Sequence, residues 1–142
     1  GYLNRPDENK KAFKNGWFHT GDVGKVDENG ILFLMDRKKD MIVSGGENIY
    51  TSEVEAALYK HPDVFECAVI GVPDYKYGES LLAVIVPVAG KNLEKETIIE
   101  HCRELIAGFK IPRKIDFVAE LPKSAMSKIL KNELRKIYSK NP

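Results

Sequence analysis

A lysine near the end of the chain, Lys128, lies in a polar segment at residues 121–130. A lysine held on a loop presents a mobile positive charge that suits phosphate or carboxylate oxygens in a developing transition state. The alternative is that Lys128 is an ordinary surface lysine, whose charge stays in water without such a role. The segment by itself favours this alternative, so other signals are needed to assign it a function.

An aspartate, Asp22, follows a glycine at the end of the segment 16–22. A carboxylate can accept hydrogen bonds from both hydroxyls of a ribose, which is why acidic residues recur at nucleotide sugars. The alternative is an aspartate that satisfies its own turn, and spacing alone favours it. His19 of the same segment is predicted to be a loop residue rather than a base or a ligand.

A cluster of charged side chains occupies residues 36–40. Such clusters are usually solvated linkers. The planar guanidinium of Arg37 would also suit a ribose or a phosphate, because it donates hydrogen bonds in a fixed geometry. Lys39 lies where a pivot between two domains is expected.

Two adjacent glycines, Gly45 and Gly46, follow an expected strand and precede an expected helix. Glycine tolerates positive φ and lets the backbone approach a ligand closely. The surrounding residues match neither of the glycine-rich phosphate-loop signatures. The pair alone is a weak signal for binding.

The elements that would position these residues begin with a β-hairpin. Residues 23–27 and 31–35 are predicted to pair across a turn at residues 27–30, which is rich in types that tolerate positive φ. Residues 4–15 are polar, which leaves the hairpin as the only element expected in the first third of the chain. A lone hairpin is marginally stable in water, so we expect it to pack on a sheet outside this chain.

From residue 40 onward the pattern alternates between strands and helices. Residues 52–55 form a capping box at the start of one helix, and Gly108 is predicted to cap the end of another. Hydrophobic periodicity predicts strands at 41–43, 64–72, 81–88 and 114–119, a loop at 73–79, and helices at about 52–60, 98–106 and 131–138. This order predicts an α+β fold in which two helices cover one face of a small, mainly antiparallel sheet.

Composition limits the range of functions. The 142 residues suffice for one compact domain with a short extension, and 22 basic residues nearly balance 21 acidic ones, so no binding of nucleic acid or of an anionic membrane is expected. Cys67 and Cys102 lie in apolar segments without metal-ligand spacing, so free buried thiols are predicted and no metal site. No apolar run is long enough to cross a bilayer, and the first residues do not resemble a signal peptide, so the sequence predicts a cytoplasmic protein.

Taken in order, the four segments resemble the C-terminal motifs of the adenylate-forming superfamily. This superfamily includes acyl-CoA synthetases, beetle luciferases and the adenylation domains of peptide synthetases. The resemblance spans essentially the whole chain, from Gly1 to Arg135. Residues 44–50, together with residues 53–55, look most like the branch of fatty-acid and aryl-acid CoA ligases.

The resemblance implies roles for individual residues. In the family, the aspartate at the position of Asp22 binds the ribose of ATP, and the arginine at the position of Arg37 approaches ribose and phosphate. The hinge of the family falls on Lys39, and its catalytic lysine falls on Lys128. The glycine that usually precedes this lysine is replaced by Ser127, so the resemblance does not predict the backbone geometry of the loop.

The resemblance also implies a binding site for CoA. The loop of Gly45 and Gly46 would line the tunnel for the pantetheine arm. The nucleotide end of CoA would lie near Tyr77, Phe109 and Arg113.

The implied reaction has two halves. A carboxylate attacks the α-phosphate of MgATP to give an acyl-adenylate and pyrophosphate, and the thiol of CoA then attacks the acyl carbon and releases AMP. Residues 1–36 would be the end of a large N-terminal adenylation domain, and residues 37–142 would be a mobile C-terminal lid. That N-terminal domain would supply the acyl pocket, most of the ATP site and any protein contacts to Mg²⁺, so this segment alone is expected to be inactive.

Two alternatives remain open. An adenylation domain of a peptide synthetase would share the first half reaction and would then transfer the acyl group to a carrier protein. A small non-catalytic α+β binding module would explain the order of the elements, because this architecture hosts many functions. Such a module would not explain why Asp22, Arg37, the glycine pair and Lys128 occur together.

Overall fold

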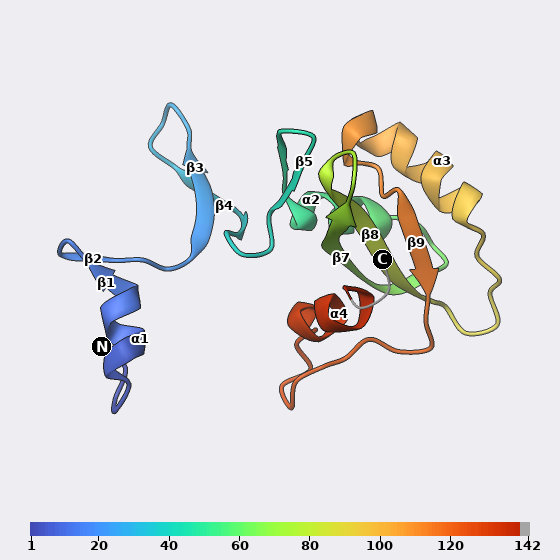
Figure 1. Ribbon diagram of the computed structural model, residues 1–142. Coiled ribbons are helices and arrows are strands. Elements are labelled where there is room, and N and C mark those ends of the chain that lie inside the picture. The colour runs from blue at the N-terminus through green and yellow to red at the C-terminus, as the bar shows by residue number, and fades with distance from the viewer. Residues whose placement is uncertain (140–142) are drawn as a thin grey trace. The chain divides into compact units, whose positions relative to one another are not determined.

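The chain divides into two compact units (Figure 1). The computed structural model describes residues 1–139, in which the first unit is Gly1–Lys39 and the second begins at Asp40. All buried side chains among the described residues belong to the second unit. The hydrophobic core of the described residues therefore lies in the second unit.

The first unit opens with a short helix that the sequence pattern did not predict. The helix α1 spans Pro6–Ala12, and the two-residue strands β1 (Phe13–Lys14) and β2 (Trp17–Phe18) pair after it. Proline at the start supplies a favourable φ, and acidic residues in the first turn and basic residues in the last complement the helix dipole. Hydrophobic periodicity missed α1 because this helix buries no residue.

The predicted hairpin of the first unit is confirmed. The strands β3 (Asp22–Val26) and β4 (Leu32–Arg37) pair in antiparallel fashion. Asp27 organises the turn, because its Oδ1 accepts the N–H groups of Asn29 at 2.9 Å and of Ile31 at 2.8 Å. Within this unit the large apolar side chains of the hairpin are exposed, namely Val26, Ile31, Leu32, Phe33 and Leu34.

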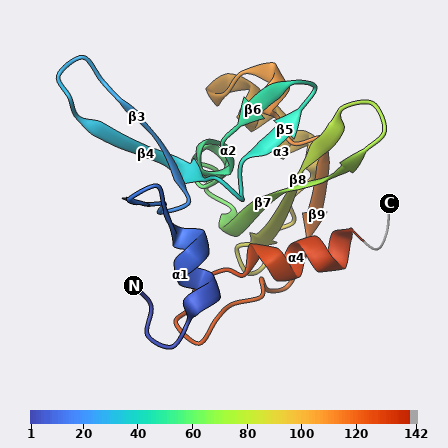
Figure 2. The same cartoon turned by 60° about the vertical axis from the view of Figure 1, so that its left-hand side comes forward.

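A five-stranded sheet forms the centre of the second unit (Figure 2). Its strands are β5 (Ile42–Ser44), β6 (Glu47–Ile49), β7 (Val64–Asp74), β8 (Gly78–Pro87) and β9 (Lys114–Phe117). The order β6-β5-β8-β7 is antiparallel throughout, and β9 pairs with β8 in parallel. Side chains alternate between the two faces along a strand, and both β7 and β8 bury both faces, so each contains a continuous apolar run, at residues 67–72 and 81–86.

Helices cover both faces of this sheet. The helices α2 (Thr51–Leu58) and α3 (Lys95–Leu105) pack on one face, against buried side chains such as Val69, Leu81 and Ile85. The helix α4 (Lys131–Tyr138) packs on the other face, against side chains that include Ile70, Leu82 and Val84. The predicted α+β fold is confirmed, with two helices on one face and the closing helix on the opposite face.

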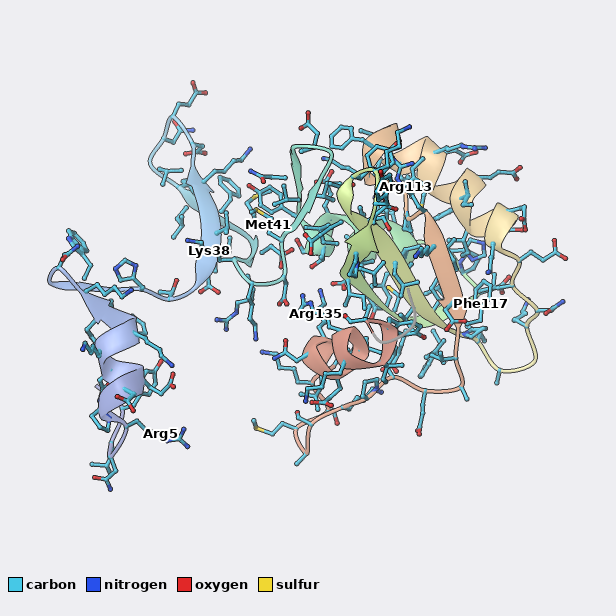
Figure 3. All side chains as sticks on the ribbon, viewed as in Figure 1. Arg5, Lys38, Met41, Arg113, Phe117 and Arg135 are labelled. Atoms are coloured by element: carbon cyan, nitrogen blue, oxygen red, sulfur yellow. The ribbon has the colours of Figure 1, made fainter. Side chains whose placement is uncertain are left out.

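One face of α4 holds this helix to three other parts of the unit. Lys131, Arg135 and Tyr138 are spaced i, i+4 and i+7, which places them on the same side of a helix. The Lys131 ammonium contacts the Glu55 carboxylate at 2.7 Å. Arg135, which is labelled in Figure 3, contacts Asp40 at 2.7 Å. The Tyr138 hydroxyl hydrogen-bonds the carboxylate of Asp116 on β9 at 2.6 Å, and burial, together with this contact, raises the Tyr138 pKa to about 12.

The predicted ends of two helices were wrong. Helix α2 begins at Thr51 rather than at Ser52, because Thr51 is fully buried and its hydroxyl accepts a hydrogen bond from Lys131 at 2.7 Å. Ser52 therefore lies inside the first turn and is not the N-cap. Helix α3 ends at Leu105, where Ile106 turns into an extended conformation and packs on the core. Gly108 is not its cap but the start of a 3-10 helix, η1, at Gly108–Lys110.

The loop predicted at residues 73–79 is much shorter than expected. Strand β7 continues to Asp74 and β8 starts at Gly78, which leaves a three-residue connection. The Asp74 carboxylate closes this turn by accepting the N–H groups of Lys76 and Tyr77, each at 3.0 Å. The hydrogen bond from Tyr77 is the main reason why the Asp74 pKa is lowered.

Both cysteines are free and buried, as the sequence predicted. Burial raises the pKa of Cys102 and, more strongly, that of Cys67, which reaches about 12. At pH 8 only about 10⁻⁴ of Cys67 would be thiolate, and the thiolate is the reactive form. We expect a thiol-specific reagent to label the native protein slowly at pH 8 and to label two thiols at once in guanidinium chloride. Rapid labelling of the native protein would contradict the burial of these thiols.

Candidate functional site

Lys128 lies on a small hairpin between β9 and α4. Residues 123 and 129 form a β-bridge, the Ser124 N–H donates to the Lys128 carbonyl at 2.8 Å, and the Leu130 N–H donates to the Pro122 carbonyl at 2.8 Å. The Lys128 side chain is exposed. Within residues 1–139, no ion pair engages its ammonium group. The fold thus presents one positive charge to solvent from a backbone that is fixed by hydrogen bonds.

Ser127 keeps the backbone geometry that a glycine would supply before this lysine. Its φ is +59°, in the left-handed region, which costs a residue with a side chain roughly 1–2 kcal/mol. Two hydrogen bonds offset this cost, because the Ser127 N–H donates to the Ser124 carbonyl at 2.9 Å and the Lys128 N–H donates to the Ser124 hydroxyl at 3.2 Å. The loop therefore forms despite the replacement of the usual glycine.

Asp22 and Arg37 lie opposite one another across the hairpin of the first unit. They are paired in register, and the Arg37 Nε contacts the Asp22 Oδ1 at 3.0 Å. The guanidinium also donates to the Thr20 carbonyl at 3.3 Å, while the Thr20 hydroxyl accepts the Asp22 N–H at 3.1 Å. The Asp22 carboxylate therefore contacts the Arg37 side chain instead of accepting hydrogen bonds from the backbone of its own turn. Both residues line an open hollow of about 390 Å³ within this unit.

Lys39 is the last residue of the first compact unit. Its neighbour Asp40 belongs to the second unit and is held there by Arg135 at 2.7 Å. Lys39 thus lies at the boundary between the two units.

The two glycines form the turn of a second hairpin, which connects β5 and β6. Ser44 pairs with Glu47, and Gly45 and Gly46 have φ values of +60° and +88°. Two consecutive positive values define the two-residue turn that suits the twist of paired strands, and glycine favours it strongly. The hairpin turn therefore explains why two glycines occur here, independently of any role in binding.

This turn lies against an aromatic ring that is stacked on an arginine. The Gly45 N–H donates to the Tyr77 carbonyl at 2.9 Å, and a Cβ at Gly45 would lie 3.2 Å from the Tyr77 ring. The Arg113 guanidinium is 3.9 Å from the ring centroid (Figure 3). The neighbouring ammonium of Lys76, and then the charge of Arg113, lower the pKa of the Tyr77 phenol. The stack offers a flat surface with two positive charges, which suits a nucleobase and a phosphate.

Phe109 does not join this stack. It lies half exposed on η1, and its ring contacts the ammonium of Lys110, 5.6 Å from the ring centroid. Lys110 itself pairs with Glu53 of α2 at 2.6 Å. The structure thus brings together Gly45, Tyr77 and Arg113 but not Phe109.

Sequence reasoning missed the carboxylates that hold α4 and the Lys128 hairpin in place. They are Asp40, Glu55 and Glu66, which contact Arg135, Lys131 and Lys123 respectively. Glu55 had been assigned to a capping box, but its Oε1 accepts the Val69 N–H of β7 at 2.7 Å as well as the contact from Lys131. No local pattern could reveal these pairs, since each joins residues far apart in the chain.

Among residues 1–139, no helix has both the length and the apolar character that crossing a membrane requires. Over the same residues, no group of three or more His, Cys, Asp and Glu side chains is arranged to hold a metal ion.

Comparison with known proteins identifies the family. The AMP-binding enzyme C-terminal domain family matches residues 53–128, a stretch that runs from α2 to Lys128. The chain belongs to this family. The resemblance to the adenylate-forming superfamily is thereby confirmed.

Members of this family in the comparison include acyl-CoA ligases. The feruloyl-CoA synthase of an Amycolatopsis species is 46% identical over 97% of this chain and 28% of its own length. The long-chain-fatty-acid–CoA ligase FadD13 of Mycobacterium tuberculosis is 46% identical over 97% of this chain and 27% of its own length. The crystal structure of ATP-bound MatB from Rhodopseudomonas palustris matches 98% of this chain and 28% of its own chain, with a TM-score of 0.87 and 38% identity. This chain therefore spans somewhat over a quarter of the length of the proteins it matches.

Proposed function

We propose that this chain is the C-terminal part of an AMP-forming acyl-CoA synthetase of the fatty-acid or aryl-acid type, which acts in the cytoplasm. The observation that carries the proposal is the exposed Lys128, presented from a hydrogen-bonded hairpin in a member of the AMP-binding enzyme C-terminal domain family. A charge that is held in place but not neutralised is suited to stabilise negative charge that develops during a reaction.

In the first half reaction, a carboxylate oxygen of the substrate bonds to the α-phosphorus of ATP while the bond to pyrophosphate breaks. Negative charge is spread over the carboxylate and the α-phosphate oxygens in the transition state. The ammonium of Lys128 would neutralise part of this charge. Mg²⁺ would arrive with ATP, and its remaining ligands would come from the N-terminal domain.

Asp22 and Arg37 would hold the sugar of the same nucleotide. One oxygen of Asp22 is engaged by the Arg37 Nε, and this contact orients the carboxylate toward the hollow that both residues line. Hydroxyls of a ribose could then donate to the carboxylate, and the remaining N–H groups of Arg37 would be near the phosphates.

In the second half reaction, the thiol sulfur of CoA bonds to the acyl carbon, the bond from that carbon to AMP breaks, and the thiol loses its proton. We propose that the second unit first rotates about Lys39, which withdraws Lys128 and presents the turn of Gly45 and Gly46 to the reaction centre. The stack of Tyr77 on Arg113 lies beside this turn and would bind the nucleotide end of CoA. Phe109 would contribute only from the rim of that site, since it lies outside the stack.

We propose that residues 1–36 belong to a larger N-terminal adenylation domain and residues 37–142 to the lid, of which the part after Lys39 rotates. The exposed apolar side chains of the β3–β4 hairpin support this division, because a two-stranded hairpin without a core requires a further packing surface. The chain also spans only 28% of the length of the feruloyl-CoA synthase it resembles. We therefore expect residues 1–142 alone to be inactive.

The test is an assay of the full-length enzyme that contains this segment. Pyrophosphate release should depend on a fatty or aromatic acid, and free CoA should then be consumed with release of AMP. Pyrophosphate release with transfer only to a carrier protein would favour a peptide-synthetase adenylation domain. The absence of acid-dependent pyrophosphate release over a wide panel of acids would favour a non-catalytic binding module.

A further inference from the structure

The two strands of the hairpin that carries Lys128 differ in the number of contacts that fix them to the rest of the unit. Its second leg leads directly into α4, which is fixed by Lys131, Arg135 and Tyr138. Its first leg follows Leu121, which is buried, and has a single charged contact, from the Lys123 ammonium to the Glu66 carboxylate at 2.6 Å. Among residues 1–139, this ion pair is the charged contact that ties the first strand of the hairpin to the sheet.

A β-bulge in β7 makes this contact possible. Val64 pairs with Pro87 and Glu66 pairs with Val86, so Phe65 is an extra residue in the strand. Residues two apart in a regular strand share a face, but the bulge reverses this relation, so Val64 packs in the core beneath α2 and α3 while Glu66 shares the face of Val86. That is the face on which α4 and the Lys128 hairpin lie. The strand irregularity thus directs a carboxylate to the base of the hairpin.

The pair is partly shielded from water. The side chain of Lys123 is 35% exposed and that of Glu66 is 22% exposed, so solvent screens this contact less than an ordinary surface pair. Lys123 also takes part in the β-bridge to Ile129, next to Lys128. Movement of Lys123 would consequently be transmitted across the hairpin to the residue beside the proposed catalytic lysine.

We propose that Glu66 and Lys123 are positioning residues for Lys128. This inference rests on the proposed function, because it concerns the half reaction in which Lys128 acts. Neither side chain need touch ATP or the acid, and both act by fixing the direction of the hairpin. Since a misplacement of about 1 Å can cost on the order of 10²-fold in rate, loss of the pair should slow adenylation without affecting a step in which Lys128 has been withdrawn.

The test uses the full-length enzyme with Glu66→Gln, Lys123→Met and the reversed pair Glu66→Lys with Lys123→Glu. We expect each single substitution to lower the rate of acyl-adenylate formation by roughly tenfold, less than a full 1 Å misplacement would cost. Thioester formation from added acyl-adenylate should change less than twofold. The reversed pair should restore most of the adenylation rate, because it restores the contact with opposite charges.

Asp63→Asn is the matched control. Asp63 pairs with Lys91 at 3.1 Å in the same unit, and neither residue belongs to the hairpin or to α4. This variant should leave both half reactions unchanged, and the unfolding temperatures of Glu66→Gln and Asp63→Asn should be similar.

The outcomes separate this inference from the proposed function. Absence of acid-dependent pyrophosphate release by the unmodified enzyme would reject the proposed function itself, and normal adenylation in Lys128→Ala would reject the role of Lys128 on which this inference rests. Loss of adenylation in Lys128→Ala together with normal adenylation in Glu66→Gln and Lys123→Met would overturn only the positioning role. Equal loss in both half reactions, or a reversed pair as slow as the single variants, would also overturn it, because either result indicates a general role in folding.

Discussion

Replacing Lys128 by alanine in the full-length enzyme should slow acyl-adenylate formation by roughly 10²- to 10³-fold, the scale for loss of one preorganised electrostatic group. The reason is that the exposed ammonium at the end of the hairpin would no longer neutralise charge on the carboxylate and the α-phosphate. Thioester formation from added acyl-adenylate should be nearly unchanged, since Lys128 would be absent from the reaction centre in that step. Rapid-quench assays of the two half reactions, run separately, measure both effects.

Lys136→Ala is a suitable control for this experiment. Lys136 is also a lysine of the last segment, but it pairs with Glu133 on the exposed side of α4. The variant should behave as the unmodified enzyme in both half reactions. An equal loss of both half reactions in Lys128→Ala would refute the assignment of this residue to adenylation.

Lys39→Pro is expected to impair the second half reaction instead of the first. Proline fixes φ near −65° and restricts the residue before it, so the backbone at the boundary of the two units could no longer change its angles freely. We expect adenylation to be retained and thioester formation to fall by roughly 10²-fold or more, because the glycine turn would not reach the reaction centre. The same pair of half-reaction assays measures this effect.

Lys39→Ala separates the backbone effect from the loss of charge. It removes the ammonium but leaves the backbone free, so thioester formation should remain close to normal. If Lys39→Ala were as impaired as Lys39→Pro, the side chain rather than rotation would be responsible. Unchanged thioester formation in Lys39→Pro would exclude a pivot at this residue.

The sequence predicted those elements whose hydrophobic period is unambiguous. Strands β7 and β8 are buried on both faces, and their apolar runs at residues 67–72 and 81–86 identified them. The predicted bounds of α4 were also correct; its apolar residues Leu134, Ile137 and Tyr138 are spaced i, i+3 and i+4, as on one side of a helix. Helix α1 was missed because it buries nothing.

Predictions from local signals failed where tertiary contacts determine the geometry. Ser52 fits a capping pattern, yet the burial of Thr51 starts the helix one residue earlier. Gly108 fits a helix cap, but the packing of Ile106 on the core ends α3 before that residue. In both places the gain from burying an apolar or hydrogen-bonded group exceeds the small preference of a capping residue.

In the candidate site, too, local signals predicted residue types but not the contacts between distant residues. Residue type and order predicted Asp22, Arg37 and Lys128 as site residues. The contact between Asp22 and Arg37 depends on the register of β3 against β4, and the backbone before Lys128 depends on the turn at Ser127. The contact of Glu66 with Lys123 could not be predicted, because it depends on a bulge that moves one side chain to the other face. Motifs therefore select the candidate residues, while long-range packing determines how these residues are held.

The way in which the second face of the sheet is covered has a consequence for biosynthesis. Ala68, Ile70 and Leu82 of that face pack in one cluster with Leu121 and Leu134, and further side chains from residues 118–138 pack against this cluster. On a ribosome the central strands would emerge long before these residues, so an apolar surface would stay open until the last helix is released. Nascent chains stalled before residue 131 should therefore bind chaperones that recognise apolar surface, and release of α4 should end that interaction.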